Sequence, residues 1–475
     1  MLRIPLILLI ALLAVTTAEG RTLEVRPGEI AAGTVTLPGH DTNLTLTGQL
    51  DASDLDRIAQ DIKDVNTLDL SGAAIVPYKG KRIGANITAA QADILPTGIF
   101  AGLRVSHLIL PASLTAIGDC ALLGSAITGI VIPECVTAVG SHAFAQCTTL
   151  RDITLPQSVT AIPDGMAEGC EALISAVIPS GVTAIGARAF SGCRSLDHID
   201  LPASLPYIGE EAFAFSGLTD ADMSGGRWLA TIGARTFASC ASLSTATLPD
   251  GAGIMGDGVF FECKSLTDVR LPSSAVTIPP LTLKGAENVT TLGLPASIAS
   301  IDTLAFAGMS GLTSLRLPAS LEHIADGAFE SCKGLSLIDG TALPAVPTLG
   351  DGVWEGVNQP EVRLNVAPSL ENVFLATPQW QDFSISATGI LPTMTGTENS
   401  LTAMFNGMSL IITSTAPLCL IELFSTDGQL LTTVSPSDSD TATIDTSAYA
   451  CHFFIVRVTA VSDGSRTVLK LLRQP

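Results

Sequence analysis

The sequence LPASLTAIG at residues 110–118 decides the fold, because close variants of it return at regular intervals along the chain. They are LPQSVTAIP at 155–163, IPSGVTAIG at 178–186, LPASLPYIG at 201–209, LPASIASID at 294–302 and LPASLEHIA at 317–325. The proline recurs every 22 or 23 residues from Pro111 to Pro318, except for one interval of 47 residues that spans two repeats with one proline missing. A fixed period of this length predicts a repeat solenoid.

Two further positions of each repeat predict how successive coils pack. The first holds Ile or a similar residue, and the second, five residues later, is usually aromatic or apolar. The first register consists of Ile117, Val139, Ile162, Ile185, Ile208, Ile232, Met255, Ile278, Ile301 and Ile324. The second consists of Leu122, Phe144, Ala167, Phe190, Phe213, Phe237, Phe260, Leu283, Phe306 and Phe329. Because one coil cannot bury its own apolar face, we expect neighbouring coils to share a continuous core.

Each repeat also predicts its own local structure. The alternation of Leu315, Arg316 and Leu317 indicates a short strand, which Pro318 ends because proline cannot donate a ladder hydrogen bond. The Ile-Gly pair predicts a second extended stretch, and the Ala-Phe segment after it predicts one helical turn that closes the coil. Ten coils stacked at about 4.8 Å per strand would form a curved rod about 50 Å long.

The agreement of these registers makes the 23-residue unit resemble the BspA-type leucine-rich repeat of bacterial surface proteins, of the kind known from Treponema pallidum. The resemblance covers most of the chain after its first 18 residues. It implies a right-handed leucine-rich-repeat coil displayed outside the cell, and it implies a binding or adhesion scaffold.

The charge balance argues against several classes of partner. Lys and Arg number 24 against 45 Asp and Glu, which gives a net charge of −21. Such a surface repels phosphate backbones and anionic lipid, so we expect neither nucleic-acid binding nor electrostatic docking to membranes. The mean hydropathy of +0.46 reflects apolar repeat positions. Since no interior run approaches the roughly 20 apolar residues of a spanning helix, we expect no transmembrane helix in the mature chain.

The amino-terminal end predicts a leader and a cap. Residues 1–18 are typical of a secretory signal peptide, with Arg3 before an apolar run. Residues 19–90 predict a cap that covers the open end of the first coil, with short strands, a helix that begins near Asp51 and Ser53 as its amino-terminal cap. The solenoid then occupies residues 91–340.

The carboxyl-terminal end predicts a second cap and a separate domain. In the cap, residues 341–384, we expect Trp380 to cover the last coil, and the alternative is a tryptophan that stacks on a ligand. A linker at 385–400 leads to a small β-sandwich at 401–475, where Asp427-Gly428 and Asp463-Gly464 predict hairpin turns.

This last domain resembles the carboxyl-terminal sorting domain of the type IX secretion system, through FIVRV at 454–458 and KLLR at 470–473. The resemblance implies transport across an outer membrane and attachment to its exterior surface. The sequence departs from the family at His452, where a glycine is usual. A plain accessory β-sandwich is the alternative.

Six of the ten cysteines share one repeat position, eight residues after the Ile register. Other repeats place Ser, Ala or Met there, so the position selects a small or soft buried side chain. We therefore predict a ladder of free thiols in the core, formed by Cys147, Cys170, Cys193, Cys240, Cys263 and Cys332. Cys120, Cys135, Cys419 and Cys451 fall outside this register, and the sequence does not determine their pairing.

The outward strand positions predict a binding surface, because in successive coils they form a sheet of free side chains on the concave face. The candidate residues are Asp152, His198, Asp200, Asp220, Asp222, Asp268, Arg270 and Arg316. Five aspartates and no aromatic residue favour a cationic patch on a protein over a glycan, which usually needs a stacking aromatic. A solvated acidic face without a ligand is the alternative.

No constellation of catalytic residues emerges, and the six histidines lack the partners that hydrolytic motifs require. We expect no catalytic residues, no cofactor and no metal site. The sequence predicts a secreted or cell-surface protein that binds a protein of a host, a neighbouring cell or the extracellular matrix. The alternative is a structural envelope protein without a specific ligand.

Overall fold

The structure is a computed structural model of the 475-residue chain. It describes residues 20–37, 43–63, 65–83, 87–225, 230–252, 254–386, 401–406, 409–414, 418–424, 430–435, 441–446, 453–460 and 466–472. The described chain divides into two units, Met1–Ser386 and Ala387–Pro475. The predicted signal peptide, residues 1–18, lies outside the described residues.

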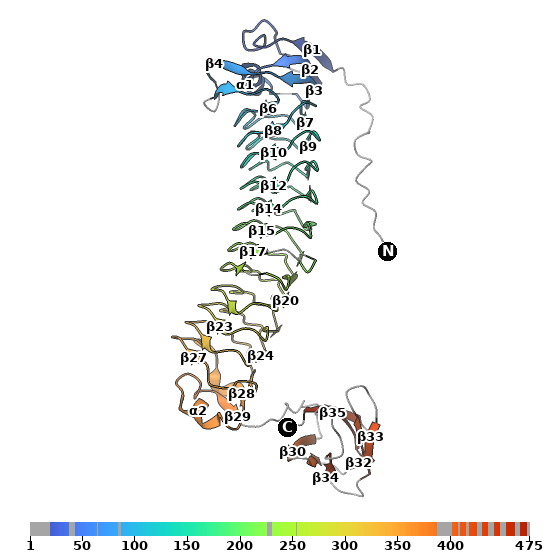
Figure 1. The fold of residues 1–475 in the computed structure, drawn as a ribbon, viewed down its shortest axis with the longest axis vertical. Coiled ribbons are helices and arrows are strands. Elements are labelled where there is room, and N and C mark those ends of the chain that lie inside the picture. The colour runs from blue at the N-terminus through green and yellow to red at the C-terminus, as the bar shows by residue number, and fades with distance from the viewer. Residues whose placement is uncertain are drawn as a thin grey trace. The chain divides into compact units, whose positions relative to one another are not determined.

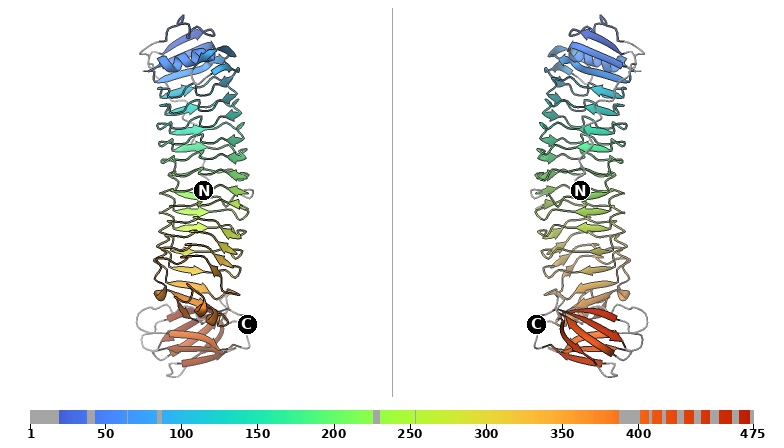
Figure 2. Two further views of the ribbon diagram at one scale, coloured as in Figure 1. Left: turned by 90° about the vertical axis from the view of Figure 1, so that its left-hand side faces the viewer. Right: turned by 90° about the vertical axis from the view of Figure 1, so that its right-hand side faces the viewer.

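The first unit is a parallel β-solenoid, which confirms the predicted fold class (Figure 1, Figure 2). One series of strands, the first strand of each coil, consists of β7 (His107–Ile109), β9 (Gly129–Val131), β11 (Asp152–Thr154), β13 (Ser175–Val177), β16 (Asp220–Asp222), β18 (Thr245–Thr247), β20 (Asp268–Arg270), β22 (Thr291–Leu292), β24 (Ser314–Arg316) and β26 (Leu337–Gly340). The predicted proline then ends the strand and begins a turn. Its carbonyl accepts a hydrogen bond from the third residue on, as from Leu114 to Pro111 at 3.0 Å.

A second series of short strands carries the Ile register. It consists of β6 (Ile94–Leu95), β8 (Ala116–Ile117), β10 (Ala138–Val139), β12 (Ala161–Ile162), β14 (Ala184–Ile185), β15 (Tyr207–Ile208), β17 (Thr231–Ile232), β19 (Ile254–Met255), β21 (Thr277–Ile278), β23 (Ser300–Ile301), β25 (His323–Ile324) and β27 (Thr348–Leu349). Equivalent residues pair in register, so Ile185 lies between Ile162 and Ile208. Repeat spacing in the sequence therefore becomes stacking in space.

The Ala-Phe segment differs from the predicted helical turn. In the coil around Phe144, the backbone N–H groups of His142, Phe144 and Gln146 donate to the next coil, and those of Ala143 and Ala145 donate three residues back. A helix would direct all of these donors along its own axis, whereas this alternation joins the coils. The geometry needs left-handed residues twice in the turn, with φ of 56° at His142 and 59° at Gln146.

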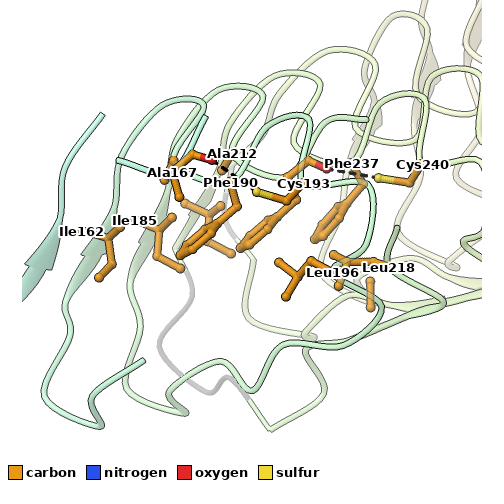
Figure 3. Packing of buried hydrophobic residues seen from close by; sticks show 14 of the residues in the cluster. Ile162, Ala167, Ile185, Phe190, Cys193, Leu196, Ala212, Leu218, Phe237 and Cys240 are labelled. Carbon is orange, nitrogen blue, oxygen red and sulfur yellow. Dashed lines mark hydrogen bonds between the residues drawn. The ribbon is translucent and has the colours of Figure 1, made fainter. Parts of the chain in front are cut away.

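Aromatic side chains stack through the core at the second register. Phe213 lies between Phe190 and Phe237, with ring centroids 5.7 Å and 5.6 Å away. Phe260 continues the column at 5.8 Å from Phe237. Figure 3 shows Phe190 and Phe237 on one side of the shared core, with Ile162 and Ile185 at equivalent places in their coils. Each ring therefore packs mainly against the residue that replaces it in the next repeat.

The predicted thiol ladder is confirmed, since all six cysteines are free and fully buried. Each thiol donates a hydrogen bond to the carbonyl of the second-register residue in the preceding coil, at 3.0 to 3.3 Å. Burial raises the pKa of Cys240 to about 11 and that of Cys332 to about 12, which keeps both thiols protonated as donors. Cys120 and Cys135 are also free, and the side chains of Cys419 and Cys451 lie outside the described residues.

The amino-terminal part of the solenoid holds β1 (Arg21–Val25), β2 (Asn43–Leu50), α1 (Ala52–Asp61), β3 (Thr67–Ile75), β4 (Tyr78–Ile83) and β5 (Ile87–Ala90). The first three strands extend the parallel sheet to β7, and β4 pairs with β5. The helix cap is Asp51 and not Ser53, because the Asp51 carboxylate accepts the backbone N–H groups of Ser53 and Asp54. The buried Asp54 carboxylate in turn accepts four backbone N–H groups, three of them from residues 28–31.

The carboxyl-terminal part of this unit holds η1 (Gln359–Glu361), β28 (Arg363–Val366), α2 (Glu371–Ala376) and β29 (Ser384–Ser386). Trp380 is fully buried, packs against Trp354 and Phe374, and donates its indole N–H to the carbonyl of Pro347 at 3.1 Å. Its interpretation as a core residue is confirmed, because a buried indole offers no face for a ligand to stack on.

The second unit contains two antiparallel sheets. One joins β30 (Leu401–Asn406), β31 (Ser409–Ser414) and β34 (Thr441–Asp445), and the other joins β33 (Leu430–Val434), β32 (Leu418–Phe424), β35 (Phe453–Ala460) and β36 (Arg466–Leu472). Side chains from both sheets, among them Leu410, Ile421 and Val456, form a common core, as in a β-sandwich. The predicted hairpin pairs β32–β33 and β35–β36 are antiparallel, and their turns lie outside the described residues.

Candidate binding surface

We define the strand face as the surface formed by the outward side chains of the first strand of each coil. The predicted residues lie on it as follows: Asp152 on β11, Asp220 and Asp222 on β16, Asp268 and Arg270 on β20, and Arg316 on β24. His198 and Asp200 occupy the equivalent segment of their own coil, which forms no strand. All eight side chains are at least partly exposed, as the alternation of each strand requires.

The structure brings three of these residues into direct contact. His198 Nε2 lies 3.1 Å from an Asp200 carboxylate oxygen, and His198 Nδ1 lies 3.6 Å from an Asp220 carboxylate oxygen. Asp222 follows two residues after Asp220 on the same face of β16. We call His198, Asp200, Asp220 and Asp222 the acidic cluster. It places three carboxylates and one imidazole on two neighbouring coils.

The other candidates lie apart from the acidic cluster. Asp268 and Arg270 are two strands further along the sheet. Arg270 forms an ion pair with Asp250 at 3.3 Å, and Arg316 forms one with Asp339 at 3.6 Å. The sequence analysis missed both acidic partners. The two arginines are therefore partly neutralised within their own surface, and Asp152 stands alone on β11.

Electrostatics in the acidic cluster favour the charged forms of its residues. Partial burial opposes a charged His198, but the hydrogen bond and charge of Asp200, together with those of Asp220, outweigh it and raise the pKa of the imidazole. Hydrogen bonds from the hydroxyl and the backbone N–H of Ser224 lower the pKa of Asp222. The cluster thus stays acidic over the physiological range, and its one cation is a histidine that titrates near that range.

The sheet under the acidic cluster is interrupted. The seven-stranded sheet ends at β13, and the next sheet begins at β16. Within the described residues, no backbone hydrogen bond joins 198–201 to either strand. The following coil also departs from the repeat, because Ser224 stands where the repeat proline is missing and β18 begins 25 residues after β16. A second interruption lies between β20 and β22.

A cleft of about 230 Å³ opens at the first interruption. The acidic cluster lines it, while Leu218, Met223 and Phe237 supply apolar walls from the core. A smaller hollow of about 70 Å³ shares Leu201, Asp222 and Met223 with it. Sequence analysis missed the apolar part of this cleft. The signal that points to it is the 47-residue interval between Pro202 and Pro249.

The stacked coils, with a strand face and an aromatic core in register, define a leucine-rich-repeat solenoid protein. The BspA type leucine-rich repeat family matches residues 93–219, 168–280 and 230–343, which together span more than half of the sequence. The chain belongs to this family. No curated protein matches the chain.

Solved structures show the same fold. A leucine-rich repeat protein from Bacteroides ovatus is 21% identical with a TM-score of 0.54, and the match covers 77% of this chain and 91% of that chain. The pneumococcal vaccine antigen PcpA is 15% identical, with a TM-score of 0.42 and coverage of 78% and 90%. A leucine-rich cell surface protein from Faecalibacterium prausnitzii is 23% identical, with a TM-score of 0.35 and coverage of 55% and 86%.

Two searches of the described residues returned nothing. No helix there has the length and apolar character needed to cross a membrane. Within the same residues, no group of three or more His, Cys, Asp or Glu side chains is arranged to hold a metal ion.

Proposed function

We propose that this protein is an exported, non-catalytic scaffold that binds a partner protein through the strand face. The partner is a surface or matrix protein of a host or of a neighbouring cell, and it presents a basic patch. The observation that carries the proposal is the acidic cluster, where Asp200, Asp220 and Asp222 meet on adjacent coils.

The charge and rigidity of the strand face support this proposal. Opposite charge steers a partner toward the surface and suppresses wrong partners, and the net charge of −21 adds a long-range attraction for basic proteins. The side chains stand on strands that are paired in register, so their spacing is set before binding. A preorganised surface loses little conformational entropy on association.

A binding assay with charge-reversed variants tests the proposal. The full chain is immobilised and screened against purified host surface and matrix proteins, and Asp200, Asp220 and Asp222 are then changed together to Lys. We expect this variant to lose binding of the captured protein. The matched control changes Glu134, Asp257 and Glu322 to Lys, because these exposed acids lie outside the strand face and carry the same charge change. Equal binding by both variants would exclude the strand face, and no captured protein would favour the structural alternative.

Export and surface display form a second part of the proposal. The signal peptide at residues 1–18 would direct export, and the β-sandwich at 401–475 would act as a type IX sorting domain. The two antiparallel sheets of the second unit are compatible with such a domain. Surface protease shaving of the native organism, with the full chain and with a chain lacking 401–475, tests this assignment. We expect exposure only with the full chain, and periplasmic retention of both forms would refute surface display.

A further inference from the structure

The cleft beside the acidic cluster combines two chemistries that an exposed strand face does not normally combine. Its mouth carries the carboxylates of Asp200, Asp220 and Asp222. Its apolar walls come from Leu218, Met223 and Phe237, which are buried residues of the solenoid core. The interruption between β13 and β16 is what exposes core side chains beside surface charge.

The dimensions and charge of the cleft indicate one kind of occupant. Sites for drug-sized ligands and cofactors usually measure about 300–1,000 Å³. A volume of about 230 Å³ is suited to a single long side chain. That side chain needs an apolar stem for the walls and a cationic head for the mouth. Arginine meets both needs, because its guanidinium is weakly hydrated, bonds carboxylates in pairs and packs on aromatic faces.

We propose that this cleft is an anchor pocket for one arginine side chain of the partner protein, an inference that rests on the proposed function of the strand face. The guanidinium binds between the carboxylates of Asp220 and Asp222, and the methylene stem lies against Met223 and Phe237. Lysine fits less well, since its ammonium is a compact and strongly hydrated point charge that cannot bond two carboxylates side by side.

His198 competes with the incoming cation. Its ring contacts Asp200 in its own coil and Asp220 on β16. On its other side β13 presents Ser175 and Val177, which do not titrate near neutral pH. When His198 is protonated, it neutralises part of the acidic cluster; when it is neutral, the carboxylates are free to bind the guanidinium. Arginine should therefore bind more tightly above the pKa of His198 than below it.

Ligand-observed saturation-transfer NMR on the full chain tests the pocket with small probes. The probes are N-acetyl-arginine amide, N-acetyl-lysine amide and N-acetyl-citrulline amide, the last being a neutral analogue of arginine with nearly the same shape. We expect saturable binding of the arginine probe at pH 8, at least about threefold weaker binding of the lysine probe, and none of the citrulline probe. Failure of the arginine probe to bind at millimolar concentration, or equal binding of the citrulline probe, would overturn the proposal.

Variants identify the cleft as the place of binding. The double change Asp220→Asn and Asp222→Asn keeps the shape and removes two charges, and we expect it to weaken the arginine probe at least about fivefold. Asp268→Asn is the matched control, because it removes an exposed charge on β20 outside the cleft. Equal weakening by Asp268→Asn would show general attraction to the acidic face and would overturn the pocket. Circular dichroism checks that each variant is folded.

The pH dependence provides an independent readout. We expect the arginine probe to bind about threefold more weakly at pH 5.5 than at pH 8, where the aspartates remain ionised and only the histidine changes charge. His198→Gln should remove this difference, and a difference that persists in the variant would refute the role of His198. The partner screen and the probe titration fail separately. Partner binding that needs the strand face without any arginine binding would leave the proposed function standing and reject the anchor pocket.

Discussion

Replacing Phe213 with Ala tests whether the aromatic column is the main source of coupling between coils. Phe213 is fully buried, and its ring stacks on Phe190 at 5.7 Å and on Phe237 at 5.6 Å. Truncation of a buried Phe to Ala usually costs about 3–5 kcal/mol, because transfer energy is lost and a cavity remains. Each stacked pair adds about 0.5–1.5 kcal/mol. Since two pairs are lost here, we expect a cost of about 4–5 kcal/mol.

Hydrogen exchange with mass spectrometry is the appropriate assay, because a stack of coils can open locally without unfolding as a whole. Amides of the coils around Phe213 should exchange faster by an amount that corresponds to this cost, and amides near the distant β24 should change little. Phe215→Ala is the control, since Phe215 is the same residue type two positions away and is 54% exposed. We expect that control to change stability by less than about 0.5 kcal/mol. A cost below about 1 kcal/mol for Phe213→Ala, or an equal cost for both variants, would refute the reasoning.

Three further perturbations follow from the described geometry. The pKa of Cys240 and of Cys332 is raised in the folded state, so ionisation in the unfolded state lowers stability as the pH rises above about 8.5. At pH 10 each thiol should contribute a loss of about 1.4 kcal/mol relative to pH 7.5, and urea unfolding of the double Cys→Ala variant should show a pH loss smaller by about 3 kcal/mol. Ser239 has φ of 57°, so Ser239→Gly should stabilise by about 0.5–1 kcal/mol in thermal unfolding, while Ser239→Ala, which keeps a Cβ, should not. Asp54→Ala leaves four backbone N–H groups without their acceptor and should cost at least about 3 kcal/mol, whereas a similar loss in the control Asp56→Ala would contradict this account.

Much of the core could be predicted because a repeat places equivalent residues in equivalent environments. The buried positions of Ile185, Phe213 and Cys240 follow from three registers that agree over many repeats. The turn after Ile-Gly could not be predicted in the same way. A short apolar segment such as Ala143-Phe144 suits a helical turn equally well, and the deciding hydrogen bonds go to the next coil. The same limit affected the helix cap, where Asp51 and Ser53 are both good capping residues by type.

The candidate surface divides along the same line. The period alone places Asp200 and Asp222 on one face of adjacent coils, because outward positions repeat with the strands. The contact of His198 with both Asp200 and Asp220 depends on side-chain directions that the period does not specify. The ion pairs of Arg270 and Arg316 were missed for a related reason. Their partners Asp250 and Asp339 lie on neighbouring coils at positions that vary between repeats.

The sequence by itself determined the solenoid, its stacking registers and its acidic character, because these properties are repeated or summed along one dimension. Only the tertiary structure decided where the sheet opens. A ladder hydrogen bond between coils joins backbone groups about 23 residues apart, and its absence at 198–201 depends on the conformation of both coils at once. The missing proline at Ser224 marks an irregular repeat, but the cleft between charge and core exists only once neighbouring coils are stacked.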